Sequence, residues 1–296
     1  MKVLSLFSGI GAFEKALTNL NINYELVGFS EIDKFAIRSY CEIHNIPEYK
    51  NLEDIEKLSK NNSILQEIKS KEIDLITHGS PCQDFSIAGK QFGGDILSNT
   101  KSSLMWNTVD IIKVIKPKYV IWENVKNILS KKHRHNFDSY LEILEDLGYN
   151  NYYQVLNAND YGIPQNRERV YTISIRKDID NGSFEFPQKQ ELILRLKDLL
   201  ETEVDEKYYL SEKIISGFKK QKNNFNGKFI PKTDNDNIAN SLNATMWKIQ
   251  RTNNYIKVAL TLDIKGQDCI KRVYDEGGIS PTLTNMQRSV IDNQKY

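Results

Sequence analysis

The sequence predicts an α/β fold with a mostly parallel sheet, joined to a smaller second domain. Short apolar runs alternate with amphipathic stretches through the first half of the chain, and this alternation is typical of strand–helix units around a parallel sheet. The chain has 296 residues, of which 40% are hydrophobic, so it is long enough for one large domain and a smaller one. We place the larger domain at 1–187 and the smaller at 188–296.

Strands are predicted where short apolar runs occur, at 2–7, 25–31, 73–79, 118–123, 152–157 and 169–175. Helices are predicted where apolar residues recur at intervals of three and four, at 12–20, 34–44, 104–115 and 137–147. The apolar stretches are far shorter than the roughly 20 residues that a membrane helix needs. Since the N-terminus also reads as a first strand, we expect a cytoplasmic protein without a membrane partner.

Composition argues against a metal site and leaves the charge open to two interpretations. Three cysteines cannot form a disulfide framework, and their spacing with the four histidines matches no zinc pattern. We interpret the stretch 131–135, which contains His133 and His135, as a solvated basic loop. The net charge is +1, yet 207–271 holds 12 Lys and Arg against 5 Asp and Glu. That balance of +7 suits a polyanionic partner, and a solvated Lys-rich surface explains it equally well.

Cys82 follows the predicted strand 73–79, within the segment GSPCQDFS at 79–86. A strand that ends in small residues and a proline brings the next side chain to the carboxyl edge of the sheet, where open α/β folds bind ligands. A lone cysteine in such a place is more often a small buried hydrophobic residue. The motifs elsewhere in the chain favour a chemical role for Cys82.

The first strand–helix connection, FSGIGAFE at 7–14, indicates a cofactor site. Its glycines permit a tight turn and close approach to a ligand, although the complete G-x-G-x-x-G pattern is missing. Glu31 ends the second strand, 22 residues after Gly9, where a carboxylate can accept hydrogen bonds from ribose hydroxyls. We therefore expect a nucleoside-containing cofactor. Asp54 is a further candidate for the adenine end, and a helix N-cap would explain it equally well.

Charged residues at two other strand ends complete the pattern. Glu123 ends the strand 118–123 and so reaches the same sheet edge as Cys82, whereas it would otherwise be a solvated loop charge. Arg167 and Arg169 lie two residues apart at the start of a strand, and side chains at that spacing point to one side. An arginine pair near a thiol indicates that an anion or a polarised carbonyl is bound.

These motifs, in this order and spacing, resemble those of the DNA (cytosine-5)-methyltransferases, and the resemblance extends to about Thr284. The matching segments are Phe7 to Gly11, Pro81-Cys82-Gln83, Glu123-Asn124-Val125 and the arginine motif at 165–169. The resemblance implies the doubly wound, Rossmann-like fold of S-adenosylmethionine-dependent methyltransferases. It also implies S-adenosylmethionine as cofactor, a catalytic domain at 1–187, and a DNA-binding target-recognition region within 188–296.

The resemblance implies a role for each motif. Cys82 would be the thiolate that adds to C6 of cytosine, because C5 alone is too poor a nucleophile to take a methyl group. Glu123 would hold the N3 and amine edge of the base, and Arg167 and Arg169 would anchor its carbonyl and orient Glu123 or Cys82. The base must be flipped out of the duplex, and we expect the segment 83–98 to clamp the flipped base. The implied cofactor-binding residues are Phe7, Gly9, Gly11, Glu31, Ile32, Asp54 and Pro81.

Duplex DNA is the expected partner, and a cognate restriction endonuclease is a second. Cytosine methylation of tRNA is an alternative, which the long basic region argues against, and a non-catalytic DNA-binding subunit is another. In the family, the segment that matches 272–284 is followed by further motifs that complete the cofactor pocket, whereas this sequence ends at Tyr296. We therefore expect either a truncated form or a chain that needs a second polypeptide for full activity.

Overall fold

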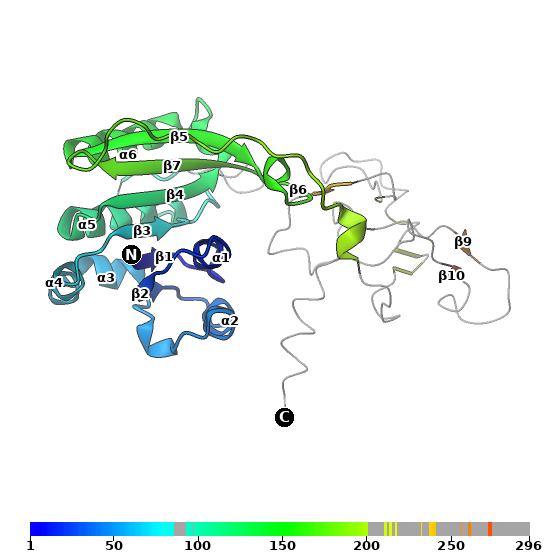
Figure 1. The fold of residues 1–296 in the computed structure, drawn as a ribbon, viewed down its shortest axis with the longest axis horizontal. Helices are drawn as coiled ribbons and strands as arrows, with labels where there is room; N and C mark the ends of the chain where they lie inside the picture. The colour runs from blue at the N-terminus through cyan, green and yellow to red at the C-terminus, as the bar shows by residue number, and fades with distance from the viewer. Residues whose placement is uncertain are drawn as a thin grey trace. The chain divides into compact units, whose positions relative to one another are not determined.

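The computed structural model describes residues 1–85, 93–96 and 98–200, together with positions 210, 211, 213, 214, 217, 232, 237–240, 255, 260, 261, 272 and 273. The chain separates into two compact units (Figure 1). Unit 1 comprises Met1–Leu156 and Glu168–Pro187, and unit 2 comprises Asn157–Arg167 and Gln188–Tyr296. The division into a catalytic domain and a target-recognition domain stays a prediction.

Unit 1 is built on a mostly parallel sheet with the strand order β2-β1-β3-β4-β7-β5. Its strands are β1 (Lys2–Leu6), β2 (Glu25–Ser30), β3 (Leu75–His78), β4 (Tyr119–Val125), β5 (Tyr149–Asn157) and β7 (Glu168–Arg176). The pairs β1–β2, β1–β3 and β3–β4 are parallel, whereas β7 is antiparallel to β4. This arrangement confirms the predicted α/β class. Because β2 and β3 lie on opposite sides of β1, the strand order reverses there, and open α/β sheets bind ligands at such a point.

Helices pack in two groups against this sheet. They are α1 (Ala12–Asn19), α2 (Lys34–His44), α3 (Ile55–Lys60), α4 (Asn62–Ser70), α5 (Met105–Ile115) and α6 (Arg134–Asp146). Helix α5 contacts α3, α4 and α6, so these four form one layer. The predicted helices are present within a few residues, whereas α3 and α4 were not among the predicted helices. The short elements are η1 (Glu48–Lys50), η2 (Lys101–Leu104), η3 (Lys126–Leu129), η4 (Ala158–Tyr161), η5 (Leu196–Leu199), β6 (Gln165–Asn166), β8 (Ala239–Asn240), β9 (Leu260–Thr261) and β10 (Arg272–Val273).

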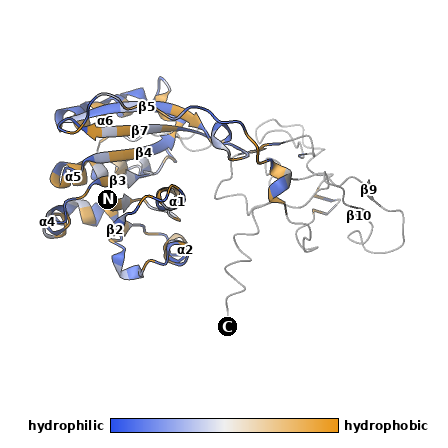
Figure 2. Ribbon diagram, viewed as in Figure 1, coloured by the Kyte–Doolittle hydropathy of each residue, from blue (hydrophilic) through white to orange (hydrophobic). Residues whose placement is uncertain are grey.

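Alternation along the inner strands explains why both faces of the sheet are covered. Leu4 and Ile76 belong to the large core that includes the apolar residues of α3 to α6. Their neighbours Val3 and Leu75 point the other way, into a smaller core with Tyr40 of α2. Strands buried on both faces carry many apolar residues, as the hydrophobic colouring along β4 and β7 illustrates, and α5, which packs in the helix layer, is also coloured largely hydrophobic (Figure 2).

Polar residues in the connections fix where the helices begin. The Asp33 carboxylate accepts hydrogen bonds from the N–H groups of Phe35 and Ala36 and so caps α2. Asn61 caps α4 in the same manner, through the N–H of Ile64. The Asp33 cap follows directly on the loop after β2, so that carboxyl-edge loop is held by the helix that it starts, whereas Asn61 joins α3 to α4.

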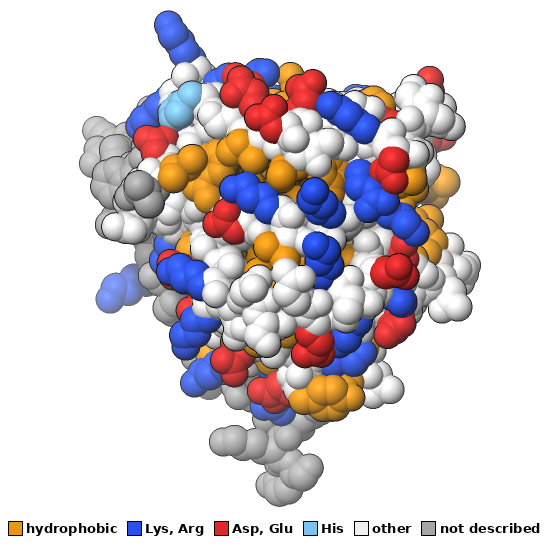
Figure 3. Space-filling view, turned by 90° about the vertical axis from the view of Figure 1, so that its left-hand side faces the viewer, with side chains coloured by type: hydrophobic (Ala, Val, Ile, Leu, Met, Phe, Trp, Pro, Cys, Tyr) orange, Lys and Arg blue, Asp and Glu red, His pale blue; other side chains and the backbone are white. Residues whose placement is uncertain are grey.

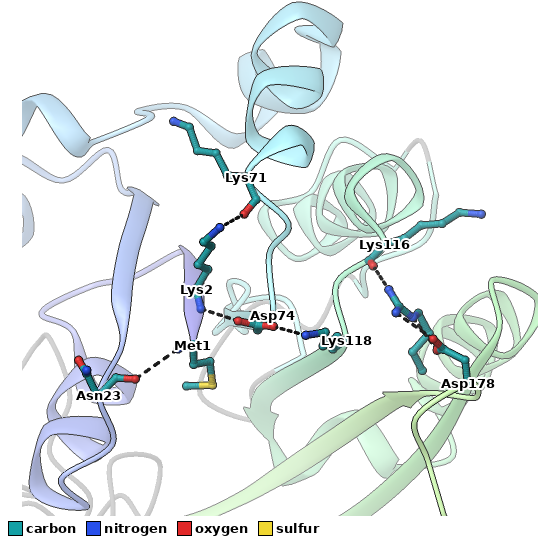
Figure 4. Close-up of polar contacts among 9 residues, drawn as sticks. Met1, Lys2, Asn23, Lys71, Asp74, Lys116, Lys118 and Asp178 are labelled. Carbon is teal, nitrogen blue, oxygen red and sulfur yellow. Dashed lines mark hydrogen bonds and ion pairs between the residues drawn. The ribbon is translucent and has the colours of Figure 1, made fainter.

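At the opposite, amino end of the parallel strands, Asp74 ties three strands together. One carboxylate oxygen accepts from the Lys2 N–H at 2.7 Å, and the other pairs with Lys118 Nζ at 2.7 Å (Figure 4). These contacts hold the pKa of Asp74 below its usual range, chiefly through the hydrogen bond from Lys118. Lys and Arg side chains lie beside apolar ones on this end of the unit (Figure 3).

The structure corrects one prediction, because His133 is not part of a solvated loop. It is buried against Phe85, with the two rings 5.4 Å apart, immediately before α6. Burial also lowers the pKa of His133. The basic neighbours in the sequence concealed a side chain that packs inward. In the described part of the chain, no helix has the length and apolar character needed to cross a membrane.

Candidate active site

The strand register brings the predicted site residues to one edge of the sheet. Leu6 pairs with both Ser30 and His78, and His78 pairs with Trp122. The next residue along each strand is therefore part of one row across the carboxyl edge. In order across the sheet, this row is Glu31, Phe7, Gly79 and Glu123.

The loop after β1 is shaped by residues with positive φ. Phe7, Gly9 and Gly11 have φ values of 52°, 56° and 82°. A Cβ at Gly11 would lie 2.2 Å from His44 Nε2, so only glycine fits there. A Cβ at Gly9 would have no described atom within 4 Å, so this part of the loop faces open space. The loop thus offers its backbone to a ligand in front of Gly9 and is tightly packed behind Gly11.

Glu31 joins the β1 loop to the connection between β2 and α2. One carboxylate oxygen accepts from the Gly9 N–H at 2.9 Å, and the other accepts from the N–H groups of Ile32 and Asp33 at 2.8 and 2.9 Å. A carboxylate has about four acceptor positions, so these bonds leave capacity for one more donor. The sequence predicted the position of Glu31 at the edge but not its bond to Gly9.

Asn51 organises the next part of the edge, and no sequence motif pointed to it. Its amide oxygen accepts from the N–H groups of Glu31 and Glu53 at 3.2 and 3.0 Å, and its amide nitrogen donates to the Glu31 carbonyl at 3.0 Å. Asp54 lies directly beyond and caps α3 through the N–H of Glu56 at 2.8 Å. The N-cap alternative for Asp54 is therefore present, and its proposed contact with adenine stays a prediction.

The Cys82 loop is anchored by buried neighbours. The Ser80 hydroxyl accepts from Trp122 Nε1 at 2.9 Å and from the Asn124 amide at 3.3 Å. Cys82 itself is half-buried and forms no disulfide. Its carbonyl accepts from the Phe85 N–H at 3.1 Å, which closes a turn over 82–85. The bonds of Ser80 and the turn over 82–85 therefore fix the backbone that carries the half-buried thiol.

Glu123 and Arg169 form an ion pair at this edge. Arg169 Nε lies 2.9 Å from Glu123 Oε1, and both side chains are largely buried. In the antiparallel pairing of β4 with β7, Glu123 faces Tyr171 and Val125 faces Arg169, so the charged pair is a diagonal one. A Cβ at Gly79 would lie 3.6 Å from Glu123 Oε2. The carboxylate thus stands against the backbone that leads into the Cys82 loop.

Arg167 is assigned to a different unit of the chain from Glu123 and Arg169. It precedes β7 and belongs to unit 2, where its N–H donates to Asn157 Oδ1 at 2.9 Å. Its predicted role in the site stays a prediction. Of the segment 83–98, which is predicted to clamp the flipped base, residues 86–92 and 97 lie outside the described residues. No cluster of metal-ligating side chains occurs among the described residues.

A buried aromatic group supports the site from beneath. His78, the last residue of β3, bonds through Nε2 to the Tyr140 hydroxyl at 2.9 Å and stacks on Trp122 at 5.7 Å. Complete burial lowers the pKa of His78 to about 3, so the ring stays neutral at neutral pH. Since His78 is four residues before Cys82, its rigid setting fixes the start of the loop.

Comparisons with known proteins agree with the motifs. A family model described as C-5 cytosine-specific DNA methylase matches residues 1–293. The chain is 35% identical to the orphan methyltransferase M.Rho11sI of Bacillus phage rho11s, over 97% of this chain and 67% of that protein. It is 40% identical to the type II methyltransferase M2.ScrFI of Lactococcus lactis subsp. cremoris, over 73% of this chain and 72% of that protein. The chain spans about two thirds of the length of the phage relatives that it matches.

Among solved structures, the fold is similar to that of the S. pombe Dnmt2 methyltransferase. The TM-score is 0.67 at 20% sequence identity, and the match covers 93% of this chain and 82% of that one. At this identity the similarity is one of fold.

Proposed function

The chain belongs to the C-5 cytosine-specific DNA methylase family, and from this premise we propose that it transfers a methyl group to C5 of a cytosine in duplex DNA. One observation carries the proposal: the Cys82 loop and the Glu123–Arg169 pair stand at the same sheet edge as the glycine loop. A nucleophile, a proton-holding carboxylate and a cofactor loop are the groups that this reaction requires. Relatives at 35% and 40% identity are named as methyltransferases, which supports the same reading.

Cys82 acts as the nucleophile in this proposal. The thiolate adds to C6 of the cytosine, and the electron pair of the C5–C6 double bond moves so that C5 becomes nucleophilic. After C5 has been methylated, solvent water takes the proton from C5, and the electron pair of that C–H bond re-forms the C5–C6 double bond as the C6–S bond breaks and the Cys82 thiolate leaves. The thiolate is the reactive form, so the rate follows the ionisation of Cys82.

Glu123 holds the proton that makes the addition favourable. In its protonated form the carboxyl donates to N3 of the base as Cys82 adds, which draws electron density from the ring. Arg169 fixes the direction of the carboxylate through the 2.9 Å contact. We keep the sequence-based assignment of Arg167 to the base carbonyl as part of the proposal. C6 is inaccessible inside a duplex, so the cytosine must be flipped out to reach Cys82.

The residues at the β1–β2 end of the edge fit S-adenosylmethionine. Ile10, Ile32 and Phe35 are 50%, 73% and 57% exposed, and exposed apolar side chains beside a glycine loop suit the face of an adenine ring. Glu31 retains an acceptor position for a ribose hydroxyl. When bound, S-adenosylmethionine supplies the electrophilic methyl group. The further cofactor-binding residues in the proposal are Phe7, Gly9, Gly11, Asp54 and Pro81.

We assign DNA reading to the basic part of 188–296, which stays a sequence-based assignment. If 207–271 neutralises several phosphates, log K for duplex DNA should fall by about 0.9 per log unit of salt for each phosphate contacted. Fluorescence anisotropy of a labelled duplex over a salt series measures this slope. An affinity that does not depend on salt would mean that the excess of Lys and Arg is only a solvated surface.

A labelling experiment tests the proposed reaction. The full chain is incubated with methyl-labelled S-adenosylmethionine and either duplex DNA or tRNA, as wild type, Cys82→Ala and Cys41→Ala. Cys41 is the matched control, because it is also a half-buried thiol in no disulfide. We expect label in DNA for the wild type and Cys41→Ala, and none for Cys82→Ala. Transfer to tRNA alone, or equal transfer by Cys82→Ala, would contradict the proposal.

Two partner predictions join the proposal. Bisulfite sequencing of host DNA that expresses the protein would identify the methylated site. A restriction endonuclease of the same system should then fail to cut that DNA. The predicted second polypeptide is tested by adding extract from the source organism to the purified chain and measuring whether methyl transfer rises.

A further inference from the structure

Two buried side chains form a reciprocal clamp directly after the nucleophile. The Asp84 N–H donates to Ser102 Oγ at 3.1 Å, and the Ser102 N–H donates to Asp84 Oδ2 at 3.1 Å. Both residues are buried, and 18 positions separate them in the sequence. Ser102 belongs to the 3₁₀ turn η2 that runs into α5, so the clamp attaches the Cys82 loop to the helix layer.

The clamp acts on Cys82 through a short, rigid path. Asp84 lies inside the turn closed by the bond from the Phe85 N–H to the Cys82 carbonyl. Phe85 cannot shift, because its ring fills the space beside Gly94 and its carbonyl accepts from the Asn127 amide at 2.6 Å. The Asp84 carbonyl also accepts from the Gly93 N–H at 3.1 Å, so the Asp84 side chain adds to the backbone bonds that hold this turn.

The charge of Asp84 gives the clamp a second effect. Its carboxylate lies against the N–H of η2, at the start of the helical segment that continues as α5, where a negative charge is favourable. A carboxylate held there keeps its position beside the loop that carries the thiol. Displacing it would alter both the direction and the ionisation of Cys82.

We propose that Asp84 and Ser102 are positioning residues that set the direction and the reactivity of the Cys82 thiol. This inference rests on the proposed function, because it assumes that Cys82 is the nucleophile. It adds two residues that the sequence motifs do not assign. The nearby Ser103 makes no such contact, since its hydroxyl donates to the Thr100 carbonyl at 2.7 Å.

Ser102→Ala and the matched control Ser103→Ala test the proposal, because each removes one hydroxyl hydrogen bond from the same turn. The main readout is the rate of Cys82 alkylation by iodoacetamide over roughly pH 6 to 9, followed by mass spectrometry of the Cys82 peptide. We expect Ser102→Ala to change this rate about tenfold and to shift its pH profile, with Ser103→Ala matching the wild type. Methyl transfer by Ser102→Ala should show a lower kcat at nearly constant KM for DNA.

Asp84→Asn and Asp84→Ala separate positioning from folding. Asparagine retains an oxygen that accepts from the Ser102 N–H, so Asp84→Asn should recover much of the wild-type kcat while alkylation keeps a shifted pH profile. Asp84→Ala removes the acceptor, so its kcat should fall and its alkylation pH profile should be shifted as well. If Ser102→Ala and Ser103→Ala have equal alkylation rates and equal kcat at equal thermal stability, the proposed positioning role of Asp84 and Ser102 is wrong. If the alkylation rates of the variants differ from the wild type as expected but the wild type transfers no methyl group, the proposed function is refuted. The role of Asp84 and Ser102 in positioning Cys82 is then still supported.

Discussion

Gly11→Ala should destabilise unit 1 more than Gly9→Ala, although both glycines lie in the same loop at positive φ. An L-residue in the left-handed region costs about 1–2 kcal/mol, and both substitutions incur this cost. Only at Gly11 does the new Cβ meet other atoms, with His44 Nε2 at 2.2 Å and Tyr40 Cε2 at 2.9 Å. At Gly9 no described atom lies within 4 Å.

The surroundings of Gly11 determine the additional loss. Tyr40 is fully buried and stacked on Phe29 with ring centroids 4.2 Å apart, so it cannot move aside. His44 must give up its 3.0 Å contact with the Ile10 carbonyl, which costs about 1 kcal/mol. Overpacking adds about 1–3 kcal/mol. We therefore expect Gly11→Ala to lose about 3–6 kcal/mol of unfolding free energy, whereas Gly9→Ala loses about 1–2 kcal/mol.

Urea unfolding measures the free energy, and isothermal titration with S-adenosylmethionine measures cofactor affinity separately. Gly9→Ala should retain most of its stability but bind cofactor weakly, because its Cβ enters the space in front of the loop. The double variant Gly11→Ala/His44→Ala removes the nearest obstacle, so its loss should be smaller than the sum of the two single losses. Equal unfolding free energies for Gly9→Ala and Gly11→Ala would refute this reasoning.

Three further perturbations test other parts of the structure. Arg169→Ala should slow single-turnover methyl transfer about a hundredfold, because a displacement of the Glu123 carboxylate by about 1 Å lowers the rate by about that factor. Arg169→Lys should restore part of the rate. An unchanged rate would show that Glu123 does not need Arg169 for its position. Duplex DNA with 5-fluorocytosine at the target should trap a covalent adduct with Cys82 that survives denaturing electrophoresis, and methyl transfer without an adduct would contradict the nucleophile. Asp74→Asn should cost about 1 kcal/mol at neutral pH. Because the folded pKa of Asp74 is depressed, its contribution is complete above about pH 4 and is lost as the pH falls through the folded pKa, so the difference in unfolding free energy should close under acid.

Local pattern was enough to predict the strands of the main sheet, the helices α1, α2, α5 and α6, and the edge on which the site lies. Apolar residues that repeat at two or at three and four positions mark strands and helices because those repeats follow from backbone geometry. A residue at the end of a parallel strand lies at the carboxyl edge whatever its distant neighbours are. For that reason the sequence pattern sufficed to assign Cys82, Glu31 and Glu123 to one edge.

Contacts between distant segments could not be predicted in this way. The sequence motifs left open whether Arg167 and Arg169 orient Glu123 or Cys82, and the antiparallel placement of β7 beside β4 brings Arg169 to Glu123. His133 is buried because Phe85 comes from another part of the chain to pack against it.

The sequence alone therefore determined the fold class and the family, and it supplied the prediction of the reactive side chains, since each motif consists of residues close together in the chain. The tertiary structure decided how those side chains are held. The Glu31 bond to Gly9 and the clamp between Asp84 and Ser102 join residues 22 and 18 positions apart. The physical reason is that a hydrogen bond depends on where folding brings two atoms, and backbone periodicity carries no record of that position.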